Sequence, residues 1–424
     1  MAVIQGRTRE QLRQSIGYNL GAMRTSTASG GSTTTVVDNT IVTGGADRFN
    51  GRWLVLQDAD ASTNDGIVRR VTDSSVTSNV YTLTFSPAAS ASVASSDTYE
   101  IWEDKYQPQR INDFINQAII DATGHAYTYK EDISLHGDGT TARFDIPTSL
   151  QMISKLQYRS SVTSTSIHTC GTTFDETTDG DFTQSLDTKD KKQGSQSLKM
   201  VIASGASAGD FVTDSITSKD LSGYDTIEMW VKSTVATSAG NLKLLLDDSA
   251  SCASPLETLS IPALSADTWT FVRMSLANPE TDTAIISVGL EYDADIGAVT
   301  VWIDDIKAVQ NDTAIWTKLD KRAWHIDKEA KDLILHGDGR TALGYRLIKL
   351  VGGAKPALLS SDSTANEIDD QYVITRATGM ALASAGGGPS TDLDSNAQRA
   401  AFWFGLAEQS KRAFPLLVDA RMVQ

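Results

Sequence analysis

Two nearly identical phrases contain the residue types most often used for chemistry. The sequence Leu-His-Gly-Asp-Gly begins at position 135 and again at position 335. His136 and Asp138, like their copies His336 and Asp338, stand two residues apart, so on a strand they could point the same way and share a metal ion. The glycines favour a different interpretation, because Gly-Asp-Gly supplies the positive φ that a tight hairpin turn requires. We therefore expect two similar hairpins in place of a metal site.

Acidic side chains offer a second kind of chemistry. A glycosidase needs two carboxylates held about 5–10 Å apart across a cleft, and residues 160–316 contain many acids. None of them lies in a phrase that specifies an acid and a nucleophile, so solvated turn carboxylates are the simpler interpretation. The chain also lacks the His-Glu-x-x-His and phosphate-loop motifs. We therefore expect a protein that is not an enzyme, and keep a polysaccharide-active enzyme as an alternative.

The net charge of −16 is unevenly distributed along the chain. Residues 160–316 hold 9 Lys and Arg against 23 Asp and Glu, while the rest of the chain holds 28 against 30. An acidic block repels phosphate, so we expect no sequence-specific binding of nucleic acid. The apolar runs are shorter than the roughly 20 residues of a membrane-spanning helix. The first residues lack the apolar stretch of a secretory signal, so we expect a chain made and first used inside a cell.

Both cysteines, Cys170 and Cys252, fall in the acidic block. Two cysteines without a His or Cys partner at metal-ligand spacing cannot build a structural zinc site. We expect them to be buried as small apolar side chains, with a disulfide as the alternative.

The flanking parts mix helices and strands. Apolar residues that recur four apart predict an amphipathic helix over 7–20, and a Ser/Thr/Gly-rich linker is expected at 25–35. Further helices are predicted at 110–126, 368–385 and 395–414. Between the first two helices, alternating segments predict a small antiparallel barrel or sheet, with strands at 35–38, 52–57, 66–72, 81–85 and 98–102.

Residues 160–316 have the pattern of a separate all-β unit. Short alternating strands are predicted at 197–202, 226–232, 242–246, 268–274, 285–290 and 299–306. Their regular spacing is typical of a sandwich or jelly roll. We therefore predict an α+β fold, in which a helical and hairpin domain formed by residues 1–159 and 317–424 carries an inserted all-β jelly-roll sandwich at 160–316.

Four phrases of this block carry a resemblance to a known family. They are Gln-Gly-Ser-Gln-Ser-Leu-Lys-Met from Gln193, Leu-Ser-Gly-Tyr-Asp-Thr-Ile-Glu-Met-Trp-Val-Lys from Leu221, Asp-Thr-Trp-Thr-Phe-Val from Asp267 and Val-Trp-Ile-Asp-Asp-Ile from Val301. Together they resemble the β-sandwich of carbohydrate-binding modules. The resemblance implies a structural Ca²⁺ at the sandwich edge, for which the candidate ligands are Asp304, Asp175 and Glu176.

The same resemblance implies a sugar-binding face, because an aromatic ring packs on the C–H groups of a pyranose. Trp230 and Tyr224 are the candidate sugar-binding residues. Core packing is the simpler expectation for Trp230, Trp269 and Trp302, since tryptophan buries a large apolar area.

Three elements of the flanks carry a second resemblance: the phrase Thr-Tyr-Glu-Ile-Trp from Thr98 before the helix at 110–126, the run Lys-Pro-Ala-Leu-Leu-Ser-Ser-Asp from Lys355, and the last segment from Arg412. Together they resemble head–tail connector or adaptor proteins of tailed bacteriophages. The resemblance implies an adaptor-like domain and a ring of about 12 copies that joins the portal protein to tail or nozzle proteins. The apolar tail is expected to dock on a neighbouring subunit or the portal through Phe414, Pro415, Leu416, Leu417 and Val418.

The leading hypothesis is therefore a non-enzymatic virion protein, a head-to-tail adaptor in the neck that is assembled in the host cytoplasm. The first alternative is a glycan-binding fibre or decoration protein that acts in attachment to the host surface. The second is a polysaccharide-active enzyme. Structural Ca²⁺ is the one cofactor considered.

Overall fold

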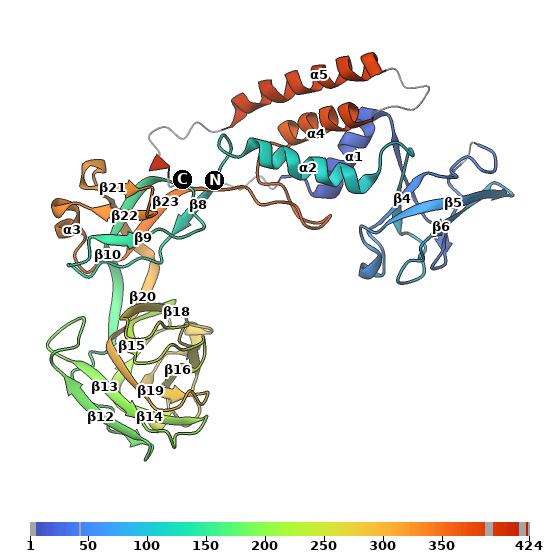
Figure 1. The fold of residues 1–424 in the computed structure, drawn as a ribbon. Coiled ribbons are helices and arrows are strands. Elements are labelled where there is room, and N and C mark those ends of the chain that lie inside the picture. Colours follow the sequence, from blue (N-terminus) through green and yellow to red (C-terminus); the bar gives the residue numbers. More distant parts are fainter. Residues whose placement is uncertain (1–5, 42–43, 386–392, 415–420, 423–424) are drawn as a thin grey trace. The chain divides into compact units, whose positions relative to one another are not determined.

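The computed structural model describes residues 6–41, 44–385, 393–414 and 421–422 (Figure 1). The chain divides into two compact units, here called unit 1 and unit 2. Unit 1 comprises Met1–Lys130, Thr148–Ser154 and Gly352–Gln424. Unit 2 comprises Glu131–Pro147 and Lys155–Val351.

Strands dominate the fold. They account for 41% of the chain against 20% for helices, and those in the described residues form four sheets. The expected α+β class, a helical and hairpin adaptor-like domain that carries an inserted jelly roll, is therefore wrong. The physical reason is that the Ser-, Thr- and Val-rich flanking segments build a large sheet of their own, and the strands of the central block continue beyond its expected ends.

Unit 1 contains a seven-stranded antiparallel sheet in the order β1-β7-β4-β5-β6-β3-β2. Its strands are β1 (Met23–Thr27), β2 (Gly30–Gly31), β3 (Thr35–Asp38), β4 (Trp53–Gln57), β5 (Val68–Thr77), β6 (Val80–Ser86) and β7 (Thr98–Trp102). The sheet confirms the strands predicted from alternation. The linker predicted at 25–35 is wrong, because five residues of β1 pair with β7 and so satisfy their backbone groups in the sheet.

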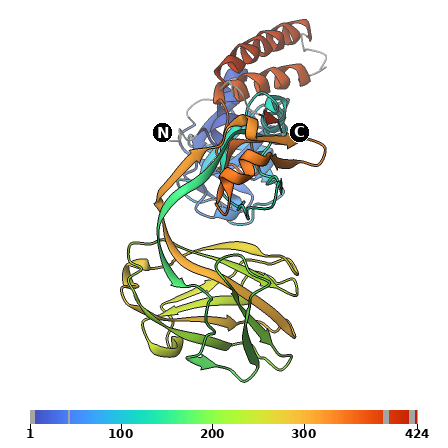
Figure 2. The same ribbon diagram turned by 90° about the vertical axis from the view of Figure 1, so that its left-hand side faces the viewer.

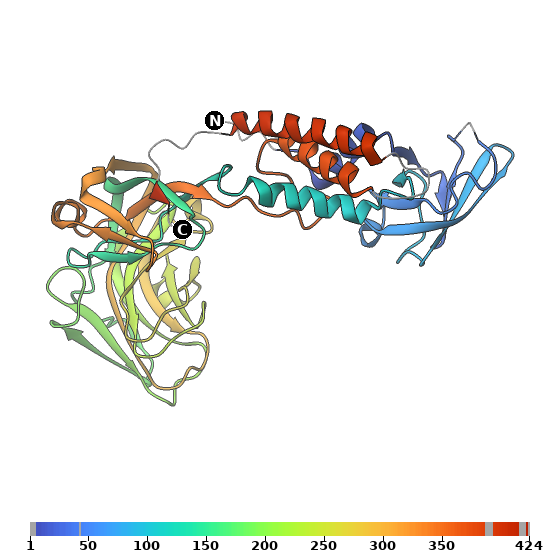
Figure 3. The same cartoon turned by 45° about the horizontal axis from the view of Figure 1, so that its top comes forward.

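Four helices complete the described part of unit 1, and they agree with the helices predicted from periodicity: α1 (Arg9–Leu20), α2 (Pro108–Ala122), α4 (Asp370–Ser384) and α5 (Leu393–Ser410). Thr8 begins α1 with a capping box that it forms with Gln11. Asp369 begins α4 by accepting the N–H of Tyr372. The apolar stripes of the helices share one core, and α4 and α5 lie side by side (Figure 3).

The larger part of unit 2 is a sandwich of two antiparallel layers (Figure 2). One layer contains β12 (Phe182–Asp187), β13 (Ser197–Ile202), β15 (Thr226–Ser233), β18 (Thr270–Ser275) and the first half of β20 (Val299–Lys318). The other has the order β11-β14-β19-β16-β17 and consists of β11 (Thr177–Thr178), β14 (Asp210–Lys219), β16 (Leu242–Asp247), β17 (Glu257–Ser260) and β19 (Ile285–Tyr292). Met200, Met229 and Ile303 of the first layer pack with Leu244 and Leu290 of the second in one core. A β-sandwich is therefore present, as the alternation in the central block predicts.

Two long strands extend out of the sandwich. β10 (Met152–His168) pairs antiparallel with β20 from Gln157 to His168, with three register shifts along the way. The domain limits expected at residues 160 and 316 both fall inside these strands. The same sheet continues through β23 (Ile348–Ala354) to β8 (Thr128–Asp132), and β24 (Arg421–Met422) pairs with the start of β10.

The two copies of Leu-His-Gly-Asp-Gly fold differently, so the prediction of two similar hairpins is wrong. In the first copy Gly139 has a φ of 74°, and the loop leads into β9 (Arg143–Asp145), which pairs with β22 (Asp332–Leu335). In the second copy the residues form a short helix, α3 (Gly337–Leu343). The second copy follows the hairpin of β21 (Trp324–Asp327) and β22, and Leu343 is buried at the end of its helix.

Candidate functional site

A pocket of about 400 Å³ opens on unit 2 where the sandwich meets the long strand β20. Its wall combines one tryptophan with charged and polar side chains, among them Glu131, Thr226, Arg273, Asn311, Trp316 and Lys349. Five strands contribute these residues, and three of them, β18, β15 and β20, are hydrogen-bonded neighbours. Pairing in the sheet therefore brings together residues that lie far apart in the sequence.

Arg273 and Asn311 form the polar side of this pocket. The Nη2 of Arg273 donates to the side-chain oxygen of Asn311, and the Nδ2 of Asn311 donates to the hydroxyl of Thr226 at 2.7 Å. Asp225 fixes Asn311 further by accepting its backbone N–H at 2.8 Å and its side-chain amide. These bonds hold the amide plane of Asn311 in one orientation and so preorganise the donors and acceptors of the pocket.

Glu228 anchors Arg273 from inside the fold. The Nε of Arg273 donates to Oε1 of Glu228 at 3.0 Å. Two further hydrogen bonds reach Glu228 from Arg159, at 2.7 and 2.6 Å. Burial alone raises the pKa of Glu228, but the hydrogen bonds and charge of Arg159 outweigh it and hold that pKa below its usual range. Glu228 is therefore an ionised, fully paired carboxylate.

Trp316 and Lys349 form the other side of the pocket. The Nζ of Lys349 lies 5.2 Å from the ring centroid of Trp316, within the range of a cation–π contact. The same Nζ lies 2.6 Å from Oε2 of Glu131. Both cations of the wall, Arg273 and Lys349, are thus paired with carboxylates, and the half-buried indole of Trp316 supplies an apolar surface between polar groups.

The sequence analysis missed this pocket because most of its residues carry no motif. Trp316 and Asn311 lie near the expected end of the central block, where β20 continues as one strand. One signal could have pointed to it. Glu228 and Arg273 are charged residues inside strands with a large apolar content, and a buried charge in a strand needs a partner.

Trp230, the leading sugar-binding candidate of the sequence analysis, presents no free ring face. It is 4% exposed and packs edge-on against His136 and Phe271, with ring centroids 4.9 and 5.2 Å away. Lys192 lies over the ring at 5.0 Å. Tyr224 is half-buried against the sandwich core. Trp230 is therefore not placed to stack on a sugar, whereas the sugar-binding role expected of Tyr224 stays a prediction.

The other two tryptophans of the central block are held by neighbouring charges. Trp302 is 8% exposed, and Lys199 and Lys232 lie over its ring at 5.2 and 4.8 Å. Trp269 is half-buried and donates from Nε1 to Oδ1 of Asp190 at 2.6 Å. Trp302 is buried, in agreement with the simpler expectation of core packing, whereas Trp269 is only half-buried.

The structure does not bring together the three expected calcium ligands. Asp304 is 1% exposed, and its Oδ2 accepts the backbone N–H groups of Lys192 and Gln193, both at 2.7 Å. Glu176 accepts the hydroxyl of Ser287 at 2.7 Å, and Asp175 is exposed. Among the described residues these three acids do not form a group with metal-ligand spacing.

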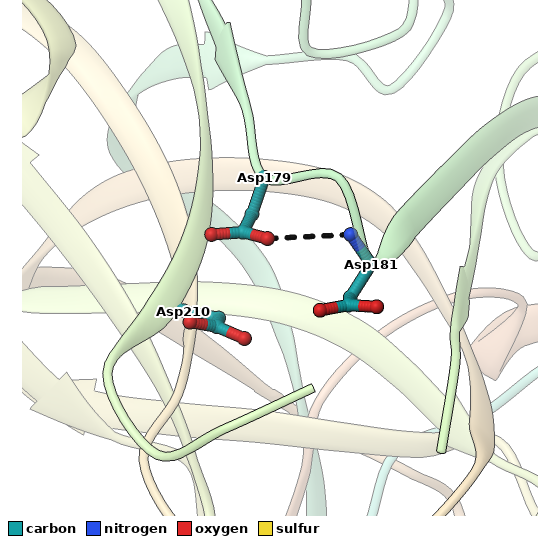
Figure 4. Close-up of side chains that lie close together, drawn as sticks. All are labelled: Asp179, Asp181 and Asp210. Atoms are coloured by element: carbon teal, nitrogen blue, oxygen red, sulfur yellow. Dashed lines mark hydrogen bonds between the residues drawn. The ribbon is translucent and has the colours of Figure 1, made fainter. Parts of the chain in front are cut away.

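One other acidic group does meet that spacing within the described residues. Asp179, Asp181 and Asp210 each place one carboxylate oxygen within 4.8 Å of the others (Figure 4). All three are half-buried, and the N–H of Asp181 donates to Oδ1 of Asp179 at 3.2 Å. Exposed acidic groups often occur without an ion, so the structural calcium expected at the sandwich edge stays a prediction.

The repeated His and Asp residues do not form paired metal sites. His136 bonds through Nδ1 to the carbonyl of Gly137 at 2.6 Å. Asp138 accepts the N–H groups of the two following threonines, and these bonds lower its pKa well below the usual range although burial opposes them. In the second copy His336 stacks on His325, with ring nitrogens 3.2 Å apart, and Asp338 is exposed.

A further phrase, Gly205-Ala-Ser-Ala-Gly209, matches the Gly-x-Ser-x-Gly pattern of serine hydrolases. In those enzymes the serine occupies a sharp turn between a strand and a helix. Here the phrase connects two strands, β13 and β14, and the N–H of Ser207 donates to Asp210. The structural context of a nucleophile elbow is absent from this loop.

Phe414 was expected to contact a partner protein. It is 7% exposed and packs on Tyr372 of α4, with ring centroids 5.1 Å apart. Phe414 therefore belongs to the helical core of unit 1, and the partner contact expected of it stays a prediction. Pro415, Leu416, Leu417 and Val418 lie outside the described residues.

The two cysteines are free and buried, as the sequence predicts, and form no disulfide with each other. Burial raises the pKa of Cys170 well above its usual range and that of Cys252 to about 11. None of the described helices is both long enough and apolar enough to cross a bilayer.

Comparisons with known proteins add a weak structural likeness. No protein-family model matches the chain, and no curated protein matches it. A solved family 11 carbohydrate-binding module of a cellulosomal cellulase of Clostridium thermocellum aligns with a TM-score of 0.27 and 11% identity, covering 36% of this chain and 96% of the module. A family 11 module from the same organism, solved with a β-1,3-1,4-mixed-linked tetrasaccharide, gives 0.26 and 11%, covering 36% and 98%.

A variant family 29 module solved with mannohexaose gives a TM-score of 0.20 and 13% identity, covering 35% of this chain and 92% of the module. At such scores the likenesses carry no argument about what this chain binds. None of the comparisons supports the expected relationship to phage head–tail adaptors. The chain is weakly similar in structure to carbohydrate-binding modules over about a third of its length.

Proposed function

We propose that this chain is a glycan-binding protein whose unit 2 binds a saccharide in the pocket that contains Trp316. The observation that carries the proposal is the combination of an indole ring with fixed hydrogen-bonding groups in one pocket. A pyranose has the same two-sided character, since its C–H groups form an apolar face and its hydroxyl groups project around the ring. An aromatic side chain packs on the C–H face, and oriented polar groups bind the hydroxyl groups.

The polar groups are of the kinds that recognise neighbouring hydroxyls. Asn311 offers its side-chain oxygen as an acceptor, because both hydrogens of its Nδ2 are donated to Asp225 and Thr226. Arg273 offers, in a fixed fork, the N–H groups that its bonds to Glu228 and Asn311 leave free. Two hydroxyls on adjacent ring carbons can therefore bind one planar side chain at the same time. Thr226 adds a hydroxyl that acts as donor or acceptor.

The charge balance of the pocket favours a neutral saccharide. Arg273 pairs with Glu228, and Glu228 also pairs with Arg159. Asn311 is hydrogen-bonded to the carboxylate of Asp225. Lys349 pairs with Glu131. A carboxylate-bearing sugar would compete with these acids for the same cations, whereas hydroxyl groups can use the remaining donors without breaking an ion pair.

The proposal is tested by screening the purified chain against a neutral and acidic glycan array and titrating the best binder by calorimetry. Trp316→Ala should weaken binding at least about tenfold, which is about 1.4 kcal/mol. Trp269→Phe is the matched control, because Trp269 is also a half-buried tryptophan of unit 2 but lies outside the pocket. Equal affinity of Trp316→Ala and the wild type, or a preference for acidic glycans, would contradict the proposal.

The remaining hypotheses stay predictions. No observation on the described residues favours the head-to-tail adaptor, with its ring of about 12 copies, its portal and tail partners and its place in the virion neck. The mass of the purified chain in solution, alone and with a portal protein, tests it. The non-enzymatic character is tested by incubating the chain with the glycans that it binds and measuring new reducing ends.

A further inference from the structure

Two buried carboxylates lie together at one end of the sandwich, and neither of them lines the pocket. Glu257 begins β17 in one layer, and Asp282 lies in the segment that leads from β18 of the other layer to β19, a strand of the same layer as β17. Glu257 is 1% exposed and Asp282 is 0% exposed. The nearness of Glu257 is one of the causes that perturb Asp282, so the two acidic groups interact directly.

The side chain of Asp282 has no compensating partner in the described structure. Neither Oδ1 nor Oδ2 accepts a hydrogen bond there, although both atoms are inaccessible to water. No basic side chain of the described residues forms an ion pair with Asp282 or Glu257, and the other charges that act on Asp282 are the acids Glu280 and Asp248. A buried carboxylate in such surroundings is unstable unless something positive neutralises it.

Backbone N–H groups fix the side chain of Glu257. Its Oε1 accepts the N–H groups of Ala277 and Asn278 at 2.8 and 2.9 Å, and its Oε2 accepts that of Ala277 at 3.0 Å. These bonds tie β17, which carries Glu257, to the segment that follows β18, and so fix the position of the carboxylate.

The backbone of Asp282 is equally well fixed. Its N–H donates to the carbonyl of Pro279 at 2.9 Å, and its carbonyl accepts the N–H of Leu221 at 2.8 Å. The carboxylate therefore occupies a set position beside Glu257 without depending on a partner for its side chain. A rigid pair of carboxylates of this kind is preorganised for a cation.

We propose that Glu257 and Asp282 hold a divalent cation of the calcium class, which ties β17 to the segment between β18 and β19 at this end of the sandwich. The donor set contains oxygen only, and carboxylate oxygens are the ligands that hard cations such as Ca²⁺ and Mg²⁺ prefer over the nitrogen and sulfur ligands of zinc. The ion neutralises both buried acids and satisfies the two oxygens of Asp282. This site differs in every residue from the group at Asp304 that the sequence suggested.

A proton shared between the two carboxylates is the competing explanation. Burial and the charge of Glu257 raise the pKa of Asp282 to about 6. A shared proton would be lost above that pH, whereas a bound cation would neutralise the pair at neutral pH. The two explanations therefore predict opposite responses to pH and to chelators.

The test measures the melting temperature of the full chain at pH 7.5 after dialysis against EDTA, with and without 1 mM CaCl₂ or MgCl₂. We expect Ca²⁺ to raise the melting temperature of the transition that includes the sandwich, because a ligand that binds only the folded state stabilises it. Asp282→Asn should abolish this rise. That variant keeps the shape of the side chain and removes a buried charge, so it should fold at least as well as the wild type in EDTA.

Asp304→Asn is the matched control, since Asp304 is also a buried acid of the sandwich with one unpartnered oxygen. It should keep the full response to Ca²⁺. A Ca²⁺ response that Asp304→Asn abolishes and Asp282→Asn keeps would overturn the assignment. So would a wild type that ignores both cations and instead loses stability in EDTA as the pH rises from 5 to 7.5, with that loss absent in Asp282→Asn.

Discussion

Arg159 and Glu228 join two strands that do not pair with each other. Arg159 lies on β10 and Glu228 on β15, and both strands pair with β20. The two side chains form parallel hydrogen bonds of 2.7 and 2.6 Å, and Glu228 is fully buried. Glu228 also accepts a hydrogen bond from Arg273. One carboxylate therefore fixes both the paired strands β10 and β20 and the polar side of the proposed saccharide pocket.

Replacing Glu228 should destabilise unit 2 strongly. Glu228→Gln removes the negative charge between Arg159 and Arg273 and leaves Arg159, which is 8% exposed, without its carboxylate. Breaking a buried pair in this way costs about 3–5 kcal/mol. Native-state hydrogen exchange of amides in β15 and β20 measures the loss locally.

Arg143→Ala is the control for that experiment, because Arg143 forms its ion pairs with Asp327 and Asp332 at the surface, where its side chain is 54% exposed. It should cost less than about 1 kcal/mol. If Glu228→Gln were as mild as Arg143→Ala, the anchoring role of Glu228 would be wrong.

His136 should make unit 2 less stable in acid. Burial beside Phe271 and Trp230 lowers the pKa of His136 to about 4, with the positive charges of Lys307 and Arg159 acting in the same direction and Glu228 and the Gly137 carbonyl opposing. Its unfolded value is about 6.5. The unfolded chain therefore binds the proton first, so the stability that neutral His136 provides is present above pH 6.5 and is lost as the pH falls toward 4.

Calorimetry of the wild type and of His136→Phe between pH 7.5 and 4.5 measures this effect. The phenyl ring keeps the contacts with Trp230 and Phe271 and does not titrate, so the melting temperature of the variant should fall less over this range. His125→Gln is the control, since His125 is exposed and should leave the pH dependence unchanged. Parallel curves for His136→Phe and the wild type would refute the prediction.

Local patterns predicted most elements of this fold and few of its contacts. The capped helix that begins at Arg9 and the alternating strands of both units follow from periodicity, because burying an apolar face requires that spacing. The same five-residue phrase, however, forms a loop after Leu135 and a helix after Leu335. The two copies have different neighbours: the carbonyl of Ala323 lies against Gly339 in the second copy, whereas the ring of Tyr345 lies against Gly139 in the first.

The candidate site was beyond prediction for a related reason. The sequence pattern places Trp316 at the end of a domain, whereas it lies within a 20-residue strand that passes through the expected limit. Trp230 and Trp316 are both tryptophans on strands, and the first is covered by His136 and Lys192, which come from distant segments, together with Phe271 of the paired strand. The local spacing of residue types along the sequence does not show whether a distant segment will cover a side chain.

Gly352 should tolerate no larger side chain. A Cβ atom added there would lie 1.9 Å from the carbonyl oxygen of Met152 on the neighbouring strand. Because the obstacle is backbone and cannot rotate away, Gly352→Ala should cost about 1–3 kcal/mol or more through strand displacement. Gly405→Ala is the control, since nothing lies within 4 Å of a Cβ at Gly405 in α5. That change should raise stability by up to about 1 kcal/mol through helix propensity. The denaturant midpoints of the two variants measure these changes in stability. Equal midpoints for Gly352→Ala and Gly405→Ala would contradict the prediction.

The thiols should be unreactive in the folded chain and reactive after unfolding. Cys170 is fully buried and Cys252 is 4% exposed, and burial raises the pKa of both, that of Cys252 to about 11. The thiolate is the reactive form, so a disulfide reagent at pH 8 finds little of it and has no access. Without any reductant, we expect no labelling in buffer and two labels per chain in guanidinium chloride. Rapid labelling of the native chain would show that the loop over Cys252 opens readily, and no labelling in denaturant would reveal the disulfide that the structure excludes.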